Sequence, residues 1–520
     1  LYHVLLILKK LCFLFQYLLE YYISVNCRKY TNCKMAGTSD ADNIVMLTDS
    51  YKMSHHKQYP PGTSQIYSYF ESRGGRFPYT VFFGLQYIIK RHLTGVVVTK
   101  EKVQEAKEFC ALHFRTDSIF DEEGWNYIIE HHGGRLPLRI KAVAEGSVVP
   151  VHNVLFTVES TDPNTAWLTG IMETLLVQTW YPMTVATNSR IQKQILDHYL
   201  RETHGDDNTL DIKLHDFGCR GCTSAESAAI GGAAHLVNFQ STDTMPALLL
   251  LRRYYHSSMA GYSIPATEHS TITAWGRDGE LQAYSNMMRQ FPDGVIACVS
   301  DSYNIWESIE KLWGKELKDE VLARGKNGGV LVVRPDSGDP PTVVLKCLEL
   351  LESSFGTTSN NKGYKMLPPY LRLMQGDGIS YRTLRSILDV LKSNKWSAEN
   401  VFFGSGGALL QQVDRDTQKC AYKCSSVTVN GEERDVYKEP ITDAGKNSKR
   451  GRLQLHMIDG EYTTLQQGQG DKDKDLLEVV YENGELVRDQ TLEDIRQRAA
   501  LSERDIDVME FLRSDADKAK

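Results

Sequence analysis

Residues 329–338 read GVLVVRPDSG, a short apolar run that ends in Arg334, Asp336 and small residues. The same pattern recurs between Ile212 and Leu410, where the apolar runs are separated by longer amphipathic stretches. The other instances are DIKLHDFGCRG (211–221), YSIPATEHS (262–270), GVIACVSDS (294–302), YLRLMQGDG (370–378) and VFFGSGG (401–407). Such runs predict buried parallel strands that alternate with helices. We therefore expect an α/β barrel or sheet with an active site where its strands end, and hence an enzyme.

The composition limits the class of protein. A chain of 520 residues with 41% hydrophobic residues can form two or three domains with real cores. The net charge of −7 argues against nucleic acid as the main partner. Ten cysteines without regular spacing favour a reducing compartment over a disulfide framework. We expect a cytoplasmic protein, with the nucleus and secretion left open.

The N-terminus differs from the rest of the chain. Residues 1–34 are apolar, but Lys9, Lys10 and Glu20 interrupt the run, so no uninterrupted stretch reaches the roughly 18–20 residues of a membrane span. Met35 resembles a more natural start than Leu1. We expect residues 1–40 to be an extension outside the fold, disordered or non-native. A membrane anchor is the less favoured alternative.

The remaining chain divides into three parts. Residues 41–181 carry strand-like runs at 43–48, 66–70, 81–83, 138–143 and 148–158, a helical pattern at 100–114, and an apolar helix at 167–180 that we expect to stop near Pro182. Residues 182–410 form the predicted barrel. Residues 411–520 contain turn signals at Asn430-Gly431 and Asp459-Gly460 and a helix start near Thr491. We expect this last part to return to the first and complete a sheet-rich α+β domain.

Two strand ends suggest phosphate and ribose binding. The glycine-rich turn in FGSGGALL (403–410) can cradle a phosphate with its backbone N–H groups, although a simple tight turn is the alternative. Arg334 and Asp336 lie two residues apart, so both can reach one ligand, although they can equally pair with each other. Gln375-Gly376-Asp377-Gly378 is a similar candidate, because its glycines let a ligand approach closely while the Asp377 carboxylate binds the ligand's hydroxyls.

His269 is the sharpest candidate for chemistry. It lies at a predicted strand end beside Glu268, where an imidazole can act as a general base or as a nucleophile toward phosphate. Asp301, at a neighbouring predicted strand end, could fix the imidazole tautomer. A structural or solvated histidine is the alternative.

Cys219-Arg220-Gly221-Cys222 has the C-x-x-C spacing. A redox role needs a thioredoxin-like setting, and a zinc site needs a second pair, which Cys420 and Cys424 do not provide. We interpret the cysteine pair as incidental.

Taken in order, these motifs resemble the nicotinamide phosphoribosyltransferase family, which belongs to the type II phosphoribosyltransferases. The resemblance runs from about Ile44 to near the C-terminus, on stretches such as TDSYK, QYPPGTSQIYSYFESR, WYPMTVATNSR, EHSTITAWG, SDSYNIW, RPDSG, PPYLRLMQGDG and FGSGG. It implies transfer of a phosphoribosyl group from phosphoribosyl pyrophosphate to nicotinamide. It also implies an irregular α/β barrel, a sheet-rich domain built from both chain ends, and a head-to-tail homodimer whose partner completes each site.

The resemblance also implies which residues bind the pyridine. Phe217 and the partner's Tyr51 would stack on the two faces of the ring. The residues near the carboxamide would be Arg220, Asp243, Ser263 and the partner's Asp49. If Asp243 is buried, its carboxylate would accept a hydrogen bond from nicotinamide and repel nicotinate, although it could instead cap a helix that begins near Met245.

The phosphate-binding residues are implied in the same way. Arg334 and Asp336 would hold the ribose and phosphate, and the cradle would be lined by Gly376, Asp377, Gly406 and Gly407. Pyrophosphate or ATP phosphates would meet Arg415, Lys423, Lys438 and the partner's Arg73. ATP would phosphorylate His269, and Mg²⁺ would neutralise the leaving pyrophosphate.

Two other functions stay open at this point. A nicotinate phosphoribosyltransferase would share the fold and most phosphate motifs, and would differ in its pyridine. An extracellular signalling protein is the alternative from another class.

Overall fold

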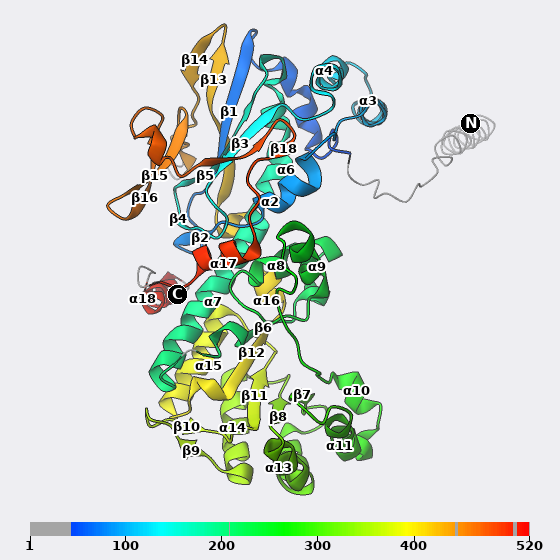
Figure 1. Cartoon of the computed structure of the whole chain (residues 1–520), viewed down its shortest axis with the longest axis vertical. Helices are drawn as coiled ribbons and strands as arrows, with labels where there is room; N and C mark the ends of the chain where they lie inside the picture. Colours follow the sequence, from blue (N-terminus) through cyan, green and yellow to red (C-terminus); the bar gives the residue numbers. More distant parts are fainter. Residues whose placement is uncertain (1–42, 207, 443–445, 503–506, 519–520) are drawn as a thin grey trace, which may run out of the picture.

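The computed structural model describes residues 43–206, 208–442, 446–502 and 507–518. The expected extension at 1–40 lies outside these residues. Figure 1 shows two halves, one built on an antiparallel sheet that contains β1 and β13, the other on a parallel sheet that contains β8 and β11. None of the helices in these ranges is long and apolar enough to cross a bilayer.

Both ends of the chain build the antiparallel sheet. Its strand order is β14-β13-β1-β5-β3-β17-β18. The strands are β1 (Thr63–Ser72), β3 (Leu138–Ala142), β5 (Val154–Ser160), β13 (Cys420–Val429), β14 (Glu432–Asp435), β17 (Glu478–Glu482) and β18 (Glu485–Leu486). Asn430 and Gly431 turn between β13 and β14 with positive φ angles of 52° and 80°, as the Asn-Gly signal predicts. The predicted sheet-rich domain with N- and C-terminal parts is therefore confirmed.

Smaller elements surround this sheet. Strands β2 (Tyr79–Val81) and β4 (Val148–Pro150) pair with each other, as do β15 (Leu453–Ile458) and β16 (Glu461–Gln466), which turn at Asp459 and Gly460. The helices of this half are α2 (Leu85–Ile88), α3 (Lys100–Phe114), α4 (Glu122–His132), α5 (Leu168–Ile171), α6 (Glu173–Val177) and α17 (Leu492–Ala499). Thr491 caps α17 through the Asp494 N–H, as predicted.

The second half holds the irregular barrel. A five-stranded parallel sheet runs in the order β6-β12-β11-β8-β7, with β6 (Leu214–Asp216), β7 (Val295–Val299), β8 (Val330–Arg334), β11 (Leu371–Gln375) and β12 (Val401–Ser405). Single parallel bridges continue the circuit from β6 to β7, through Asp216–Thr242, Ser241–Tyr262 and Ala266–Ala297. The helices are α7 (Trp180–Thr203), α8 (Ala225–His235), α9 (Met245–Tyr254), α10 (His269–Thr273), α11 (Glu280–Gln290), α12 (Ile305–Glu307), α13 (Lys318–Lys326), α14 (Pro340–Phe355), α15 (Tyr381–Ser393), α16 (Gly407–Leu410) and α18 (Val508–Lys518). The predicted α/β fold class is confirmed.

Three local predictions are wrong. Residues 262–270 form only isolated bridges, because Pro265 in this stretch has no N–H for a ladder, and His269 instead begins helix α10. Pro182 lies in the first turn of α7 rather than after a helix, since a first-turn residue needs no intrahelical N–H bond. Residues 43–48 are turns rather than a strand, and the Asn43 amide binds the Lys102 carbonyl on α3 at 2.9 Å.

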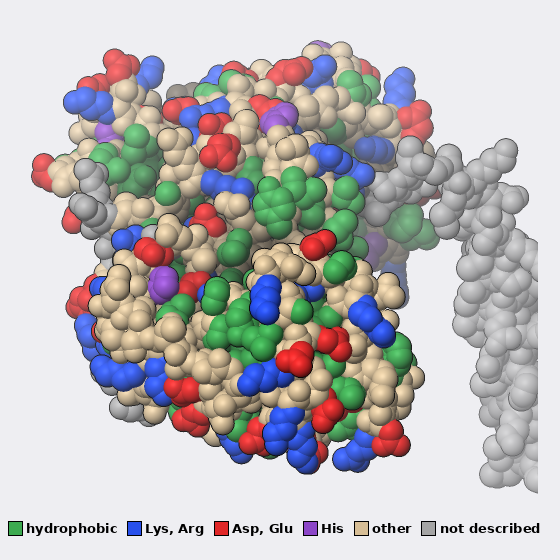
Figure 2. Space-filling view, turned by 60° about the horizontal axis from the view of Figure 1, so that its bottom comes forward, with side chains coloured by type: hydrophobic (Ala, Val, Ile, Leu, Met, Phe, Trp, Pro, Cys, Tyr) green, Lys and Arg blue, Asp and Glu red, His purple; other side chains and the backbone are tan. Residues whose placement is uncertain are grey.

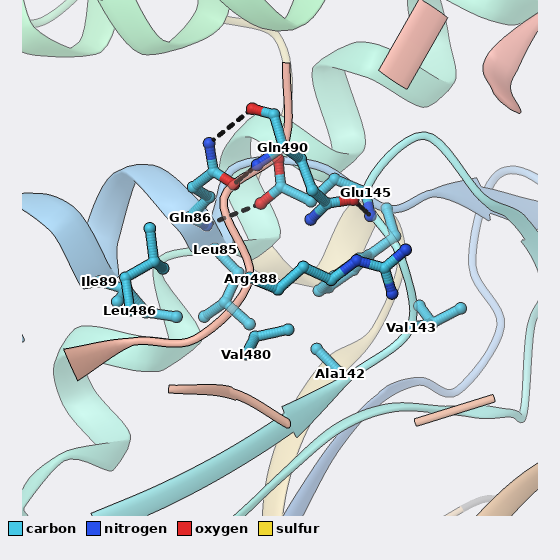
Figure 3. A pocket seen from close by; sticks show the side chains of 11 residues that line it. Leu85, Gln86, Ile89, Ala142, Val143, Glu145, Val480, Leu486, Arg488 and Gln490 are labelled. Atoms are coloured by element: carbon cyan, nitrogen blue, oxygen red, sulfur yellow. Dashed lines mark hydrogen bonds between the residues drawn. The ribbon is translucent and has the colours of Figure 1, made fainter. Parts of the chain in front are cut away.

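A small pocket marks where the C-terminal part attaches to the N-terminal part (Figure 3). Gln86 donates to the Gln490 carbonyl at 2.9 Å, and the Gln490 N–H donates back to the Gln86 side chain at 2.8 Å. The Glu145 carboxylate accepts from the Gln86 N–H at 2.7 Å. Burial raises the pKa of Glu145 to about 7. The predicted domain boundaries near 181 and 410 stay a prediction.

Candidate active site

The ends of β7 and β8 bring His269, Asp301 and Asp336 together. His269 Nε2 lies 3.0 Å from Asp301 Oδ1, and the side chain of Asp301 is only 4% exposed. The other oxygen of Asp301 accepts from the Asp336 N–H at 3.0 Å and from the Ser337 hydroxyl at 2.5 Å. A carboxylate held on three sides fixes the orientation of the half-exposed imidazole. Sequence reasoning paired His269 with Asp301 but missed Ser337, three residues beyond the end of β8.

Phe217 and Arg334 form the next part of the site. The Arg334 guanidinium lies 5.0 Å from the centre of the Phe217 ring and donates to Asp336 at 2.8 Å. The Arg–Asp pair that was the alternative interpretation is thus present. Arg334 Nε is nevertheless buried without a hydrogen-bond partner among the described residues, which favours a ligand for the same side chain.

Glycine at position 404 makes room for the Phe217 ring. A Cβ on Gly404 would come within 2.1 Å of that ring, and a Cβ on Gly376 would come within 3.1 Å. The aromatic face is therefore held in place by β12, which lies beside β6, and by the residue that follows β11, the next strand of the sheet. Gly404 was not predicted as a site residue, because its role is visible only once the strands are packed.

Asp243 receives two hydrogen bonds. His215 Nε2 lies 2.9 Å from Asp243 Oδ1, and the Ser263 hydroxyl donates to the same oxygen. Partial burial by itself would raise the pKa of Asp243. The hydrogen bonds from His215 and Ser263 lower that pKa by more than burial raises it, so the carboxyl pKa lies below its usual range. The condition that Asp243 is buried is not met in the single chain, where its side chain is 46% exposed.

The alternative role for Asp243 is also wrong. Thr244 is the N-cap residue of α9, and the carboxylate of Asp243 faces His215 and Ser263. Sequence reasoning missed His215. The signal was available, because His215 in β6 and Phe217 directly after it lie two residues apart, a spacing that places side chains of extended backbone on one side.

The other predicted barrel residues lie at the exposed edge. The Arg220 side chain is 89% exposed and lies 3.9 Å from Glu268, which caps α10. The Asp377 side chain is exposed, and its carbonyl accepts from Gln375 at 2.9 Å. A Cβ on Gly406 would come no closer than 3.6 Å to another group, and one on Gly407 would meet nothing within 4 Å. The protein itself does not require glycine at 407, which leaves space for a ligand.

A second set of predicted residues gathers around Glu173 in the sheet-rich half. Lys52 pairs with Glu173 at 2.7 Å, and the neighbouring Thr174 hydroxyl donates to Asp49 at 2.6 Å. Tyr51 is 60% exposed. No hydrogen bond or ion pair of the described residues joins Asp49 or Tyr51 to Phe217 or Asp243 in the same chain.

The predicted phosphate-binding cations belong to this second set. Burial lowers the pKa of Lys423, and Glu173 opposes this shift. Three further positive charges lower that pKa too, those of Arg73, Arg415 and Lys438. Lys423 therefore lies close to three other cations, and such a cluster of positive charge can bind an anion of high charge. Sequence reasoning named all four but missed Glu173.

The described residues contain no group of three or more His, Cys, Asp or Glu side chains arranged to hold a metal ion. A magnesium ion would therefore depend on substrate oxygens for most of its ligands, which is the usual arrangement for Mg²⁺ with phosphates.

Comparison with known proteins defines the class. The model of the nicotinate phosphoribosyltransferase (NAPRTase) family matches residues 212–485, and that of the nicotinamide phosphoribosyltransferase N-terminal domain matches residues 43–140. The nicotinamide phosphoribosyltransferase of Xanthomonas campestris pv. campestris (strain 8004) is 52% identical over 468 residues, which cover 88% of this chain and 98% of that protein. The chain belongs to the nicotinate phosphoribosyltransferase family, among relatives named nicotinamide phosphoribosyltransferase.

Solved structures support the fold. A nicotinate-nucleotide pyrophosphorylase from Pyrococcus furiosus superposes with a TM-score of 0.55 at 15% identity, covering 90% of this chain and 97% of its own. Human nicotinic acid phosphoribosyltransferase gives a TM-score of 0.52 at 16% identity, covering 87% and 93%. At these identities the likeness concerns the fold alone.

Proposed function

We propose that this protein is a pentosyltransferase that moves the phosphoribosyl group of phosphoribosyl pyrophosphate onto the ring nitrogen of nicotinamide. The products are nicotinamide mononucleotide and pyrophosphate, and the reaction serves NAD salvage. The observation that carries the proposal is the clustering of an aromatic face, a carboxylate and a guanidinium (Phe217, Asp243, Arg334). Arg334 lies 5.0 Å from the centre of the Phe217 ring, and His215, which contacts Asp243, has its ring centre 5.0 Å from that of Phe217. The 52% identical relative supports the same reaction.

Each of these groups has a role in the proposed reaction. Phe217 supplies a flat apolar surface for the pyridine, and Asp243 accepts a hydrogen bond from the carboxamide N–H₂. Arg334 and Asp336 meet the ribose and its phosphate. Positive charge develops at the anomeric carbon as pyrophosphate leaves, so alignment of the ring nitrogen and electrostatic stabilisation supply most of the rate enhancement.

The proposal includes Mg²⁺ and ATP. One or two carboxylates plus substrate phosphates suffice for Mg²⁺, and Asp336 is the carboxylate next to the phosphate-binding Arg334. The bound ion would neutralise charge on the leaving pyrophosphate. His269 would accept a phosphoryl group from ATP, with Asp301 holding the ring. Phosphorylation would add negative charge beside the pyrophosphate site and favour the reactive complex.

The proposal also includes a homodimer with shared sites. Tyr51 and Asp49 lie in the half of the molecule that contains β1, whereas Phe217 and Asp243 lie in the barrel half (Figure 1). The barrel set is flanked by exposed apolar side chains, among them Met245 and Tyr262. Figure 2 shows hydrophobic side chains grouped on one face, with Lys, Arg, Asp and Glu interspersed around them. A second copy would cover apolar surface and bring Tyr51 to the open face of the ring.

The cysteines in the described part of the chain are free thiols, which supports a cytoplasmic location.

The test of the activity is to incubate the purified protein with nicotinamide, phosphoribosyl pyrophosphate, Mg²⁺ and ATP, and to identify products by mass. Nicotinamide mononucleotide is the expected product. A parallel reaction with nicotinate that runs faster would replace the proposal by nicotinate phosphoribosyl transfer.

A further inference from the structure

The cysteine pair 219/222 lies directly beside the residues that meet the pyridine. It follows Phe217 and encloses Arg220 in the one-turn 3₁₀ helix η5 (Cys219–Gly221). Both cysteines are free and half-buried. Neither thiol takes part in the proposed reaction.

The backbone already holds the two cysteines at disulfide spacing. The Gly221 N–H donates to the Gly218 carbonyl at 2.9 Å, and the Cys222 N–H donates to the Cys219 carbonyl at 3.4 Å. A turn closed by such a bond brings the first and fourth Cα atoms within about 7 Å, and disulfides span roughly 4.4–6.8 Å. Side chains three residues apart also eclipse in a 3₁₀ helix, so both sulfurs lie on one side.

The surroundings of the two thiols differ. The Cys222 thiol donates to the Gly218 carbonyl at 3.5 Å, and burial with the nearby Asp216 raises its pKa. Cys219 stands next to the exposed Arg220 cation. Because the Cys222 sulfur is engaged by the Gly218 carbonyl, Cys219 is the attacking thiol and Cys222 the resolving thiol. A metal site does not fit, because no third ligand gathers here among the residues that the structure describes.

We propose that Cys219 and Cys222 are a reversible thiol–disulfide site that controls nicotinamide binding. The Cys219 thiolate attacks one sulfur of a low-molecular-weight disulfide, forms a mixed disulfide and releases one thiolate. The deprotonated Cys222 sulfur then attacks Cys219 and releases the second thiolate. The protein loses two protons and two electrons, and the small disulfide gains the electrons and becomes two thiols.

Oxidation changes the turn that carries Phe217. The new S–S bond removes the Cys222 hydrogen bond to Gly218, the residue that follows Phe217 and precedes Cys219. Gly218 has little room to move, since a Cβ there would come within 2.6 Å of Leu410 and 3.1 Å of the Asp216 carboxylate. An oxygen of that carboxylate accepts the Gly218 N–H at 2.7 Å. Misplacing a binding group by about 1 Å can cost up to a hundredfold in rate. We expect the KM for nicotinamide to rise roughly tenfold on oxidation, with the KM for phosphoribosyl pyrophosphate unchanged.

The activity part of this inference rests on the proposed function, whereas formation of the cross-link does not. The test treats the full-length protein with glutathione disulfide, maps disulfides by peptide mass and then measures both KM values. The expected result is a Cys219–Cys222 cross-link, a raised KM for nicotinamide, and full recovery with dithiothreitol. Bound nicotinamide should also slow the cross-linking.

Two variants are compared. The first is a double variant that combines Cys219→Ser and Cys222→Ser, and the second is Cys424→Ser, a control distant in sequence from the turn. The double variant should keep the basal activity of the reduced protein and lose its response to oxidation, while Cys424→Ser should respond like the wild type. Absence of the 219–222 cross-link, or a double variant that glutathione disulfide inhibits as strongly as the wild type, would overturn the proposal. A reduced wild-type protein that makes no nicotinamide mononucleotide would instead overturn the proposed function.

Discussion

We propose that substrate choice depends on Asp243. Its lowered pKa keeps it ionised near neutral pH, so it attracts the N–H₂ of nicotinamide and repels the carboxylate of nicotinate. Asp243→Ser should lower kcat/KM for nicotinamide by roughly ten- to a hundredfold, since the lost hydrogen bond is worth about 1–3 kcal/mol. It should also raise the use of nicotinate. Competition between the two pyridines measures this, and an unchanged preference would remove Asp243 from specificity.

In the proposed mechanism, His269 is the residue that links ATP to the reaction. His269→Ala should abolish ATP hydrolysis and the ATP-dependent gain in product, while leaving a basal rate without ATP. Asp301→Asn should weaken the same two activities, because the amide presents a donor where the imidazole N–H needs an acceptor. A His269→Ala protein that is still fully stimulated by ATP would show that the phosphoryl acceptor is elsewhere.

Two glycines of β12 and α16 separate pyridine binding from phosphate binding. Gly404→Ala places a methyl group 2.1 Å from the Phe217 ring, so it should raise the KM for nicotinamide by about tenfold or more. Gly407→Ala meets no protein atom, so it should fold normally and raise only the KM for phosphoribosyl pyrophosphate. Steady-state kinetics with each substrate varied in turn gives both values. If Gly407→Ala leaves both KM values unchanged, the phosphate cradle lies elsewhere.

At the scale of elements, Glu145 joins the N-terminal sheet to the C-terminal segment. Its folded pKa of about 7 lies above its ordinary value of 4.5, so between these pH values the folded protein keeps a proton that the unfolded chain has released. Unfolding then releases a proton, and stability falls as the pH rises from 4.5 to about 7, by about 3 kcal/mol in total. Above pH 7 this contribution no longer changes.

Glu145→Gln should remove that pH dependence. Relative to wild type, the variant should be less stable at pH 5, where the folded wild-type protein keeps the neutral carboxyl that the unfolded chain has lost. At pH 8 the variant should be relatively stabilised, because the folded wild-type protein then carries a buried carboxylate that glutamine lacks. Denaturant unfolding at both pH values measures the difference. An equal change in the free energy of unfolding at pH 5 and pH 8 would show that Glu145 does not titrate in this range.

The elements also show how far sequence reasoning reaches. Five of the six apolar runs became strands because each combines a buried run with a polar end. Residues 262–270 share that appearance, yet Pro265 and the lack of a continuous neighbour leave them as isolated bridges. Gly404 escaped prediction because its role comes from a contact across strands, which a pattern along one strand does not contain. His215 was missed although its two-residue spacing from Phe217 was a usable signal.

At the scale of the whole molecule, the predicted site residues fall into two sets in two halves of one chain. The family resemblance named both sets, but the distribution of Tyr51 and Phe217 between the halves is visible only in the folded structure (Figure 1). In the proposed homodimer, a second copy of the chain brings the two sets together in one site. If the site is shared in this way, two chains that are defective in different sets should together form one working site.

The most direct measurement mixes Tyr51→Ala with Asp336→Ala after each has been shown to be inactive alone. Each heterodimer should contain one intact site with a wild-type Tyr51 and a wild-type Asp336. Complete exchange at equal concentrations should then restore roughly a quarter of the wild-type rate of nicotinamide mononucleotide formation, since half of the dimers are mixed and each has one working site. No recovery, with subunit exchange confirmed by mass, would contradict a site shared between two chains.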